Sequence, residues 1–476
     1  MIFHSLDFIV FFLVTTALYW RLPTRGQNVL IVIASYVFYG WVHPWFLSLI
    51  ALTTVADYWA ARGMEARPAQ KRLMLVASLV VNLGLLGFFK YFNFFAENVH
   101  VVLAAMGLDV GRPTLSVLLP VGISFYTFQE LSYTIEVYRG TLRARRNFVD
   151  FAAFVCFFPQ LVAGPIERAS HLLPQVEQPR SWSWPLARAA FFLIVWGYFK
   201  KLVIADNVGV IANKVFALDT PSFPVLWAGV FAFAIQIYAD FSAYSDIARG
   251  VARWLGFDLM VNFNHPYLAS GPIDFWRRWH ISLSSWFRDY VYIPLGGSRQ
   301  GRARTLINVF ATFVVSGLWH GASWNYVMWG AYHGALVVTA RLFGEMPRRR
   351  RSEAWAVLEP FQVAGTFVLV SVGWLMFRET DLAMLWRHLT LSPFGTTLAE
   401  RQIGIYLFLL TFVYSLPIWI ESVWAVHLSR HVSRGSSGAE WAGWQTMAAA
   451  VLAGCALLGI LVLRSLQSLD FIYFQF

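Results

Sequence analysis

The chain has 476 residues, of which 58% are hydrophobic and only 13% are charged, and its formal net charge is +11. Soluble globular proteins carry about 25% charged residues, so this composition excludes an ordinary soluble protein and predicts an integral membrane protein. The basic excess is first explained by cytoplasmic loops, and nucleic-acid binding is not expected because the charges are scattered among hydrophobic runs.

Apolar runs that approach the length of a membrane span, about 17–25 residues, recur along the whole chain. They cover residues 5–20, 27–42, 45–61, 73–96, 115–138, 187–205, 223–248, 355–377, 401–421 and 445–466. The first run has no basic leader and no small-residue cleavage site, which predicts a retained span rather than a signal peptide. The run at 148–163 is interrupted by FFPQLVAGP, which indicates a broken or re-entrant helix that lines protein or water.

The two cysteines, Cys156 and Cys455, both lie in apolar runs. This pattern predicts buried, inert thiols and offers neither a disulfide framework nor a CxxC metal site. No acidic cluster suits a metal either, so no metal is expected.

Basic residues give the spans an orientation. The loop with Arg21 and Arg25 is assigned to the cytoplasm. The basic clusters that then share this side are 62–72, 139–146 and 346–353. The loops on the other side, 97–114 and 206–222, carry one basic residue each. We therefore expect a single all-α membrane domain over 1–476, with both termini outside and about 11 spans plus re-entrant or interfacial helices.

The segment 249–304 is too charged to span a membrane. Its sequence FWRRWHISLSSWFRDYVYIPLGGSRQGRAR interleaves aromatic and basic residues, which is typical of an interface or of a cover over the cytoplasmic mouth of a bundle. The arginines available there are Arg277, Arg278, Arg288 and Arg299. They are candidates to hold the phosphates of an acyl-CoA donor, although orientation alone also explains a basic mouth.

The sequence SGLWHGASWNYVMWGAYHG, residues 316–334, places His320 near the apex of a predicted hairpin. A helix from Arg304 carries His320 about 24 Å along its axis, and the chain then returns to Arg341. The apex lies inside a hydrocarbon layer about 30 Å thick. A histidine at that depth faces a cavity or a partner and is a functional candidate, whereas His333, on another helical face, is expected to be structural.

The absence of familiar catalytic motifs limits the classes of reaction that the sequence suggests. The sequence contains no GxSxG elbow, no HExxH and no P-loop. One deep histidine without an assigned serine or cysteine nucleophile suits general-base activation of a hydroxyl, which then attacks an activated acyl group. An apolar cavity favours the neutral imidazole that this step requires.

Several long motifs resemble those of the membrane-bound O-acyltransferases, in the branch typified by the integral-membrane subunit of alginate O-acetylation. They are LPVGISFYTFQELSYTIEVYRG (119–140), FFPQLVAGPIER (157–168), IYADFSAYSDIARG (237–250), NFNHPYLASGPIDFWRRWHISLSSWFRDYVYIPLGGSR (262–299) and the hairpin sequence. The resemblance implies a helical bundle around a transmembrane tunnel, with the donor entering from the cytoplasm and the acceptor from the opposite face. The family's invariant histidine matches His320, and its second signature polar residue matches His280.

The expected site therefore has two catalytic histidines, His320 and His280. The expected substrate-binding residues are Trp319, Asn325, Arg277, Arg278 and Trp279. No cofactor is expected to be bound, since acetyl-CoA acts as the donor substrate.

The expected function is acetyl transfer across a bacterial inner membrane, in contact with membrane lipids. The acceptor is an extracytoplasmic polysaccharide such as alginate, often reached through a separate extracytoplasmic acyltransferase. Three alternatives remain open: an acyltransferase for peptidoglycan, cellulose or a teichoic-acid intermediate; a polysaccharide or lipid transporter without chemistry; and a scaffold for an export complex. A transporter often shows internal repeats and charged residues at mid-membrane, and the sequence has neither.

Overall fold

The computed structural model describes residues 1–108, 111, 114–116, 118–344, 353–432, 438–467 and 469–472, and no strand occurs among them. The chain forms two compact units, one of residues 1–191 with 248–260 and the other of residues 192–247 with 261–476. The expectation of one domain over the whole chain stays a prediction. Most of the basic cluster at 346–353, residues 346–352, lies outside the described residues.

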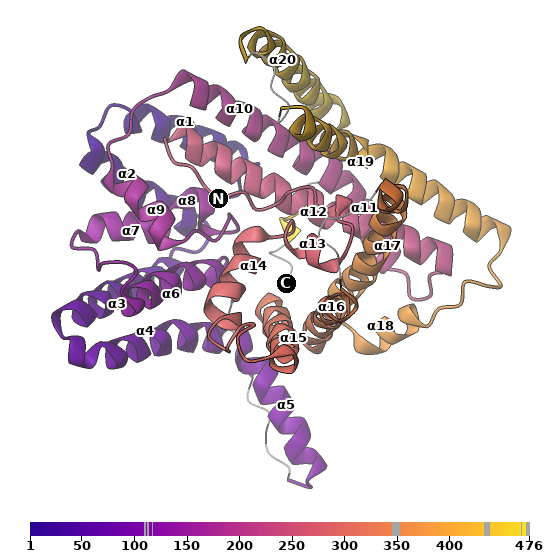
Figure 1. The fold of residues 1–476 in the computed structure, drawn as a ribbon, viewed down its shortest axis with the longest axis horizontal. Helices are drawn as coiled ribbons and strands as arrows, with labels where there is room; N and C mark the ends of the chain where they lie inside the picture. The colour runs from indigo at the N-terminus through magenta and orange to yellow at the C-terminus, as the bar shows by residue number, and fades with distance from the viewer. Residues whose placement is uncertain are drawn as a thin grey trace. The chain divides into compact units, whose positions relative to one another are not determined.

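The first unit consists of nine complete helices. They are α1 (Leu6–Tyr19), α2 (Thr24–Gly40), α3 (Phe46–Ala66), α4 (Lys71–Leu86), α5 (Phe92–Ala105), α6 (Ile123–Arg139), α7 (Phe148–Cys156), α8 (Phe158–Leu161) and α9 (Ala169–Glu177). Helices α3, α4 and α6 lie side by side (Figure 1). The predicted break near Pro159 is confirmed, because α7 ends at Cys156 and the short α8 follows.

The second unit carries the hairpin and most of the C-terminal helices. They are α11 (Asp206–Phe216), α13 (Pro272–Trp276), α14 (Ile281–Phe287), α15 (Arg302–His320), α16 (Trp324–Phe343), α17 (Glu353–Arg378), α18 (Leu382–Leu389), α19 (Leu398–Val432) and α20 (Gly438–Leu463). Two further helices, α10 (Trp184–Phe199) and α12 (Phe223–Trp254), contribute residues to both units.

The predicted spans all coincide with helices, but several boundaries were wrong. The run at 115–138 becomes helical only at Ile123, because Pro120 and the left-handed Gly122, with φ 79°, precede the helix. Both predicted outer loops are partly helical: α5 continues to Ala105, and α11 covers the first part of 206–222. Hydropathy alone therefore assigned parts of these two helices to loops.

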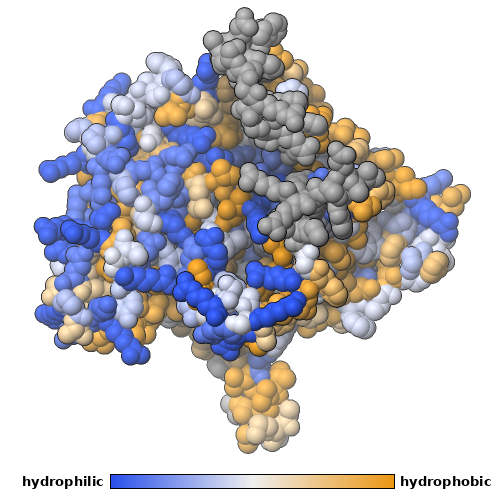
Figure 2. Space-filling model, in the orientation of Figure 1, coloured by the Kyte–Doolittle hydropathy of each residue, from blue (hydrophilic) through white to orange (hydrophobic). Residues whose placement is uncertain are grey.

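Four stretches of the described helices are long and apolar enough to cross a membrane. They are Pro68–Ala105, Phe223–Trp254, Leu358–Arg378 and Leu398–Ala425. The apolar surface of α5, which exposes Phe95 and Val99, is visible in Figure 2. These features support a polytopic helical membrane protein and do not establish the number of spans.

The two cysteines differ in their surroundings. Cys156 at the end of α7 is buried as expected, but Cys455 on α20 is exposed, so the prediction of two buried thiols was wrong for one of them. The physical reason is that α20 packs through one face, where Ala453 and Ala456 contact Val195, while Cys455 points elsewhere on the helix.

Candidate active site

The predicted hairpin is confirmed: α15 and α16 pack along each other, and His320 is the last residue of α15 (Figure 1). Glycines allow this close approach. A Cβ atom at Gly317 would overlap the backbone oxygen of Tyr326, and one at Gly330 would overlap the backbone oxygen of Phe313. Close helix contacts of this kind depend on small residues in membrane proteins, so the sequence itself fixes how His320 faces α16.

His320 is buried, with 6% of its surface exposed, and its ring is surrounded by aromatic rings. Its centroid lies 4.9 Å from Trp319, 5.0 Å from Trp329 and 5.3 Å from Phe377. All three rings stand nearly perpendicular to the imidazole. Three aromatic rings thus enclose the imidazole.

His280 lies in the same aromatic cluster. It is fully buried between α13 and α14, with its centroid 4.6 Å from Phe241 and 6.3 Å from Trp319. Trp319 therefore contacts the rings of both His280 and His320. Burial lowers the pKa of the His280 imidazole to about 3, so this ring is neutral at physiological pH and is able to accept or donate one hydrogen bond.

His333 occupies a different environment on α16. Its ring lies 4.9 Å from Trp329 and 5.2 Å from Trp276, and its Nε2 atom faces the backbone of Gly373, where a Cβ atom would overlap it. Among the described residues this Nε2 atom has no hydrogen-bond partner. The ring is thus enclosed by helix packing rather than directed into the cavity described next.

A cavity of about 410 Å³ runs beside α15. Val309, Thr312 and Ser316 line it from successive turns of one face of the helix, and His320 follows on the same face, one turn or about 6 Å beyond Ser316. Ile281, the residue after His280, also lines the cavity. Ser316, one turn before His320, and Ile281, next to His280, thus line the cavity, although neither predicted catalytic histidine is itself a lining residue.

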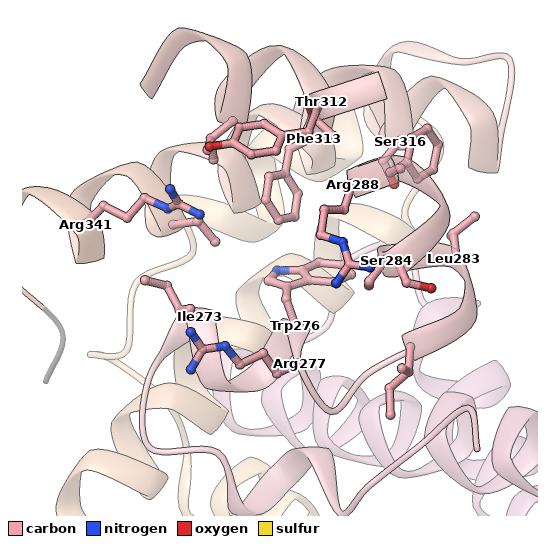
Figure 3. A pocket seen from close by; sticks show the side chains of 16 residues that line it. Ile273, Trp276, Arg277, Leu283, Ser284, Arg288, Thr312, Phe313, Ser316 and Arg341 are labelled. Atoms are coloured by element: carbon pink, nitrogen blue, oxygen red, sulfur yellow. The ribbon is translucent and has the colours of Figure 1, made fainter. Parts of the chain in front are cut away.

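Three arginines line the same cavity, and Figure 3 shows Arg277 and Arg341 near one end and Arg288 above Trp276. All three are exposed. Arg288 is paired with Asp289 at 2.7 Å, whereas Arg277 and Arg341 make no ion pair or side-chain hydrogen bond within the described part of the chain. A polar, cationic mouth therefore adjoins an apolar passage.

The predicted substrate-binding arginines differ in their positions. Arg277 lines the cavity, but Arg278 forms an ion pair with Asp274 at 2.9 Å and also donates to the backbone oxygen of Asn264. Arg299, the remaining candidate at the mouth, is exposed and does not line the cavity.

The other predicted binding residues are buried. Trp279, 2% exposed, packs against Trp374 at 4.8 Å in the aromatic core. The Asn325 side chain donates to the backbone oxygen of Met376 at 3.3 Å, which ties α16 to α17. Trp319 alone among these three contacts the histidines.

Sequence reasoning missed Arg341, Ser316 and the wall of Trp329 and Phe377. A signal for Arg341 was available, since an antiparallel hairpin brings the end of α16 back to the start of α15. The bond from Arg302 to the backbone oxygen of Leu342 confirms this pairing. No local motif marks Phe377, because α17 is distant in sequence.

The chain is similar in sequence to several known proteins. The sequence model of the family described as MBOAT, membrane-bound O-acyltransferase family, matches residues 46–376. The chain is 42% identical over 403 residues to a probable alginate O-acetylase AlgI of Pseudomonas aeruginosa, covering 83% of this chain and 76% of that protein. It is also 42% identical over 390 residues to the Pseudomonas putida protein of the same name, covering 80% and 78%.

A relative named for another acceptor is also similar. The peptidoglycan O-acetyltransferase of Helicobacter pylori is 34% identical over 403 residues, covering 76% of this chain and 74% of that protein. The matched regions include the whole hairpin and the segment that carries His280.

Proposed function

The chain belongs to the membrane-bound O-acyltransferase family and is an O-acyltransferase, and we propose that it moves an acetyl group from cytoplasmic acetyl-CoA to an extracytoplasmic polysaccharide such as alginate. The observation that carries the proposal is the cavity that follows α15 from exposed arginines to one turn before His320. The name of its Pseudomonas relatives, probable alginate O-acetylase, supports the acetyl group and the acceptor class.

The donor lies along the cavity with its phosphates at the mouth. Arg277 and Arg341 are available for phosphate oxygens, and guanidinium groups bind phosphate through charge-assisted hydrogen bonds. By the hairpin register, in which Arg302 bonds to Leu342, Arg341 lies level with about residue 302 of α15, so roughly 27 Å separates that level from His320 along the helix. A long donor arm bridges this distance past Thr312 and Ser316 and presents its thioester to the histidines.

The transfer step uses His320 as the general base. The neutral imidazole accepts the proton of the acceptor hydroxyl as its oxygen attacks the thioester carbonyl carbon. A C–O bond forms and the C–S bond breaks. The departing CoA thiolate takes the proton from the imidazolium and leaves as the thiol, so the histidine returns to its starting state without a metal or a bound cofactor.

His280 contacts the thioester or the acceptor and does not remove the proton. Its ring is buried and neutral, and Trp319 connects it to His320. A neutral imidazole orients a reacting group by one hydrogen bond, which contributes to positioning in the transition state.

The remaining features of the proposal concern the membrane. About 11 spans with both termini outside surround a tunnel in the bacterial inner membrane, so that the donor enters from the cytoplasm and the acceptor from the other face. Transfer to the polysaccharide proceeds directly or through an extracytoplasmic partner.

Thioester turnover by the purified protein tests the proposal. In detergent, with acetyl-CoA and alginate oligosaccharides or an added extracytoplasmic partner, release of CoA thiol should accompany acetylation, and His320→Ala should reduce both by roughly 10²–10⁴-fold. A protein that binds the glycan without releasing thiol would be a transporter or scaffold. Acetylation of peptidoglycan fragments in preference to alginate would move the acceptor to the alternative that the Helicobacter pylori relative suggests.

A further inference from the structure

His280 is held in an unusual backbone conformation. Its φ and ψ are 44° and 54°, in the left-handed region. Only His265 shares a positive φ among the non-glycine residues that the structure describes. A left-handed conformation is unfavourable for a residue other than glycine, and it persists only where the surrounding structure imposes it.

Two backbone hydrogen bonds close the chain around His280. The amide of Ile281 donates to the backbone oxygen of Asn262 at 2.9 Å, and the amide of Asn264 donates to the backbone oxygen of Arg278 at 2.9 Å. These bonds join the segment 262–264 to the residues on both sides of His280. The segment between them, with α13, therefore forms a closed loop whose base carries the histidine.

The Asn262 side chain adds three contacts to this base. Its Oδ1 atom accepts from the Ser282 hydroxyl at 2.9 Å and from the Ser282 amide at 3.3 Å, which caps the first turn of α14. Its Nδ2 atom donates to the Ser245 hydroxyl of α12 at 3.2 Å. Asn262, Ser245 and Ser282 are all buried, so water does not replace these bonds.

The same residues set the direction of the imidazole. Phe263, the neighbour of Asn262, lies nearly parallel to the His280 ring at 6.4 Å, while Phe241 of α12 lies perpendicular to it at 4.6 Å. Because Asn262 connects the loop base to α12 through Ser245, it holds the ring between the two phenylalanines and beside Trp319.

We propose that Asn262 is a positioning residue for His280: its backbone and side chain fix the left-handed turn that presents the imidazole beside Trp319 and His320. The inference rests on the proposed function, in which His280 contacts the donor or the acceptor. It adds a residue whose side chain touches neither histidine and acts through the backbone of the loop.

Acetyl transfer by a set of Asn262 variants tests the inference. Asn262→Leu keeps the size of the side chain and removes all three polar contacts, so kcat should fall about 10–100-fold while the KM for acetyl-CoA stays within about twofold. Asn262→Asp keeps an acceptor for Ser282 and should retain most of kcat. Ser282→Ala is a milder change and should lower kcat in the same way. It keeps the inference testable if Asn262→Leu fails to fold.

Asn264→Ala is the matched control. Asn264 lies two residues away and is exposed, and its backbone bond to Arg278 survives the substitution, so its kcat should stay within about twofold of the wild type. An equal loss of kcat in Asn264→Ala and Asn262→Leu would overturn the inference.

A double variant separates positioning from loosening of the fold. If Asn262 acts through His280, Asn262→Leu should cause no further loss of kcat in a His280→Ala background. Multiplied losses would overturn the inference while His320→Ala still identifies the base, so the proposed function would stand. Full kcat in His280→Ala would overturn the role of His280, and the inference with it.

Discussion

The imidazole of His320 and the indole of Trp329 lie nearly perpendicular, with centroids 5.0 Å apart, and the same indole lies 4.9 Å from the ring of His333. The two histidines of the hairpin thus share one aromatic neighbour. They differ in what lies on their other sides, because His320 continues the helix face that lines the cavity, whereas His333 faces the backbone of Gly373. Aromatic contact alone therefore does not distinguish the two histidines, and the assignment of His320 as the base stays a prediction.

His320→Ala should reduce acetyl transfer by roughly 10²–10⁴-fold without loss of folding, because general-base catalysis contributes about that factor. His333→Ala should retain most activity and lose stability through the cavity it leaves among Trp276, Trp329 and Gly373. Initial rates and thermal unfolding of both purified variants make the comparison. A larger loss of rate in His333→Ala would reverse the two assignments.

Arg277→Ala and Arg341→Ala should each raise the KM for acetyl-CoA several-fold with little change in kcat, because phosphate contacts contribute equally to the ground state and the transition state. Arg278→Ala is the control, since its guanidinium is already paired with Asp274. Steady-state kinetics with varied acetyl-CoA measure KM and kcat for each variant. An unchanged KM in both variants would leave these arginines as anchors at the lipid headgroups.

Much of the hairpin could be predicted from the sequence because its signals are local. An apolar stretch between basic residues, with glycines beside a histidine, specifies two close antiparallel helices. The register of Gly317 against Tyr326 and of Gly330 against Phe313 was not predicted and is found in the structure. The break near Pro159 was equally local, since proline removes a backbone donor.

The rest of the site could not be read in this way, because it depends on contacts between distant segments. Arg277 and Arg278 are adjacent in the sequence, yet one lines the cavity and the other is bound to Asp274. Trp279 carries the same aromatic signal as Trp319 but packs into the core. Hydropathy does not determine which side chains of a short helix such as α13 face the cavity. Composition therefore predicted a basic, aromatic mouth but not which of its residues line it.

Gly317→Ala should destabilise the protein by about 1–3 kcal/mol, since the added methyl group meets the backbone of Tyr326 and cannot be relieved by side-chain movement. The matched control is Gly365→Ala in α17, where a Cβ atom has open space. There the helix propensity of alanine should stabilise by up to about 1 kcal/mol. Shifts of opposite sign in the unfolding temperature are expected, and shifts of the same sign would contradict the close packing of α15 and α16.

Stability should depend on pH through His280. Its pKa is lowered to about 3 by burial, so the unfolded state, with a histidine pKa near 6.5, binds the proton more readily. The stabilising contribution is complete above pH 6.5 and is lost as the pH falls toward 3, by about 2 kcal/mol between pH 7 and pH 5. His280→Asn, which tolerates the left-handed backbone, should lose less stability over this interval in thermal unfolding. Parallel losses in both proteins would show that His280 takes up no extra proton on unfolding.

A buried cation, Lys201, anchors the C-terminal segment. Lys201 lies 2.9 Å from Asp206 and 3.0 Å from Asp240, and it donates to the backbone oxygen of Leu469 at 2.9 Å. Asp240 in turn accepts from the amide of Ile472 at 2.6 Å. Lys201, Asp206 and Asp240 are almost completely buried, so one positive charge and two negative charges depend on each other rather than on water.

Lys201→Met should destabilise the protein by about 3–5 kcal/mol, because it leaves two buried carboxylates without their cation. Asp240→Asn should cost less, since the lysine keeps Asp206 and the net charge of the group falls from −1 to zero. Thermal unfolding gives the ranking, and carboxypeptidase digestion reports release of the C-terminal segment that includes Leu469 and Ile472. Faster digestion should follow the loss of stability in Lys201→Met. A variant that unfolds at the wild-type temperature with its C-terminal segment still protected would show that packing of Phe471 against Tyr244, at 4.6 Å, holds the segment without the ion pairs.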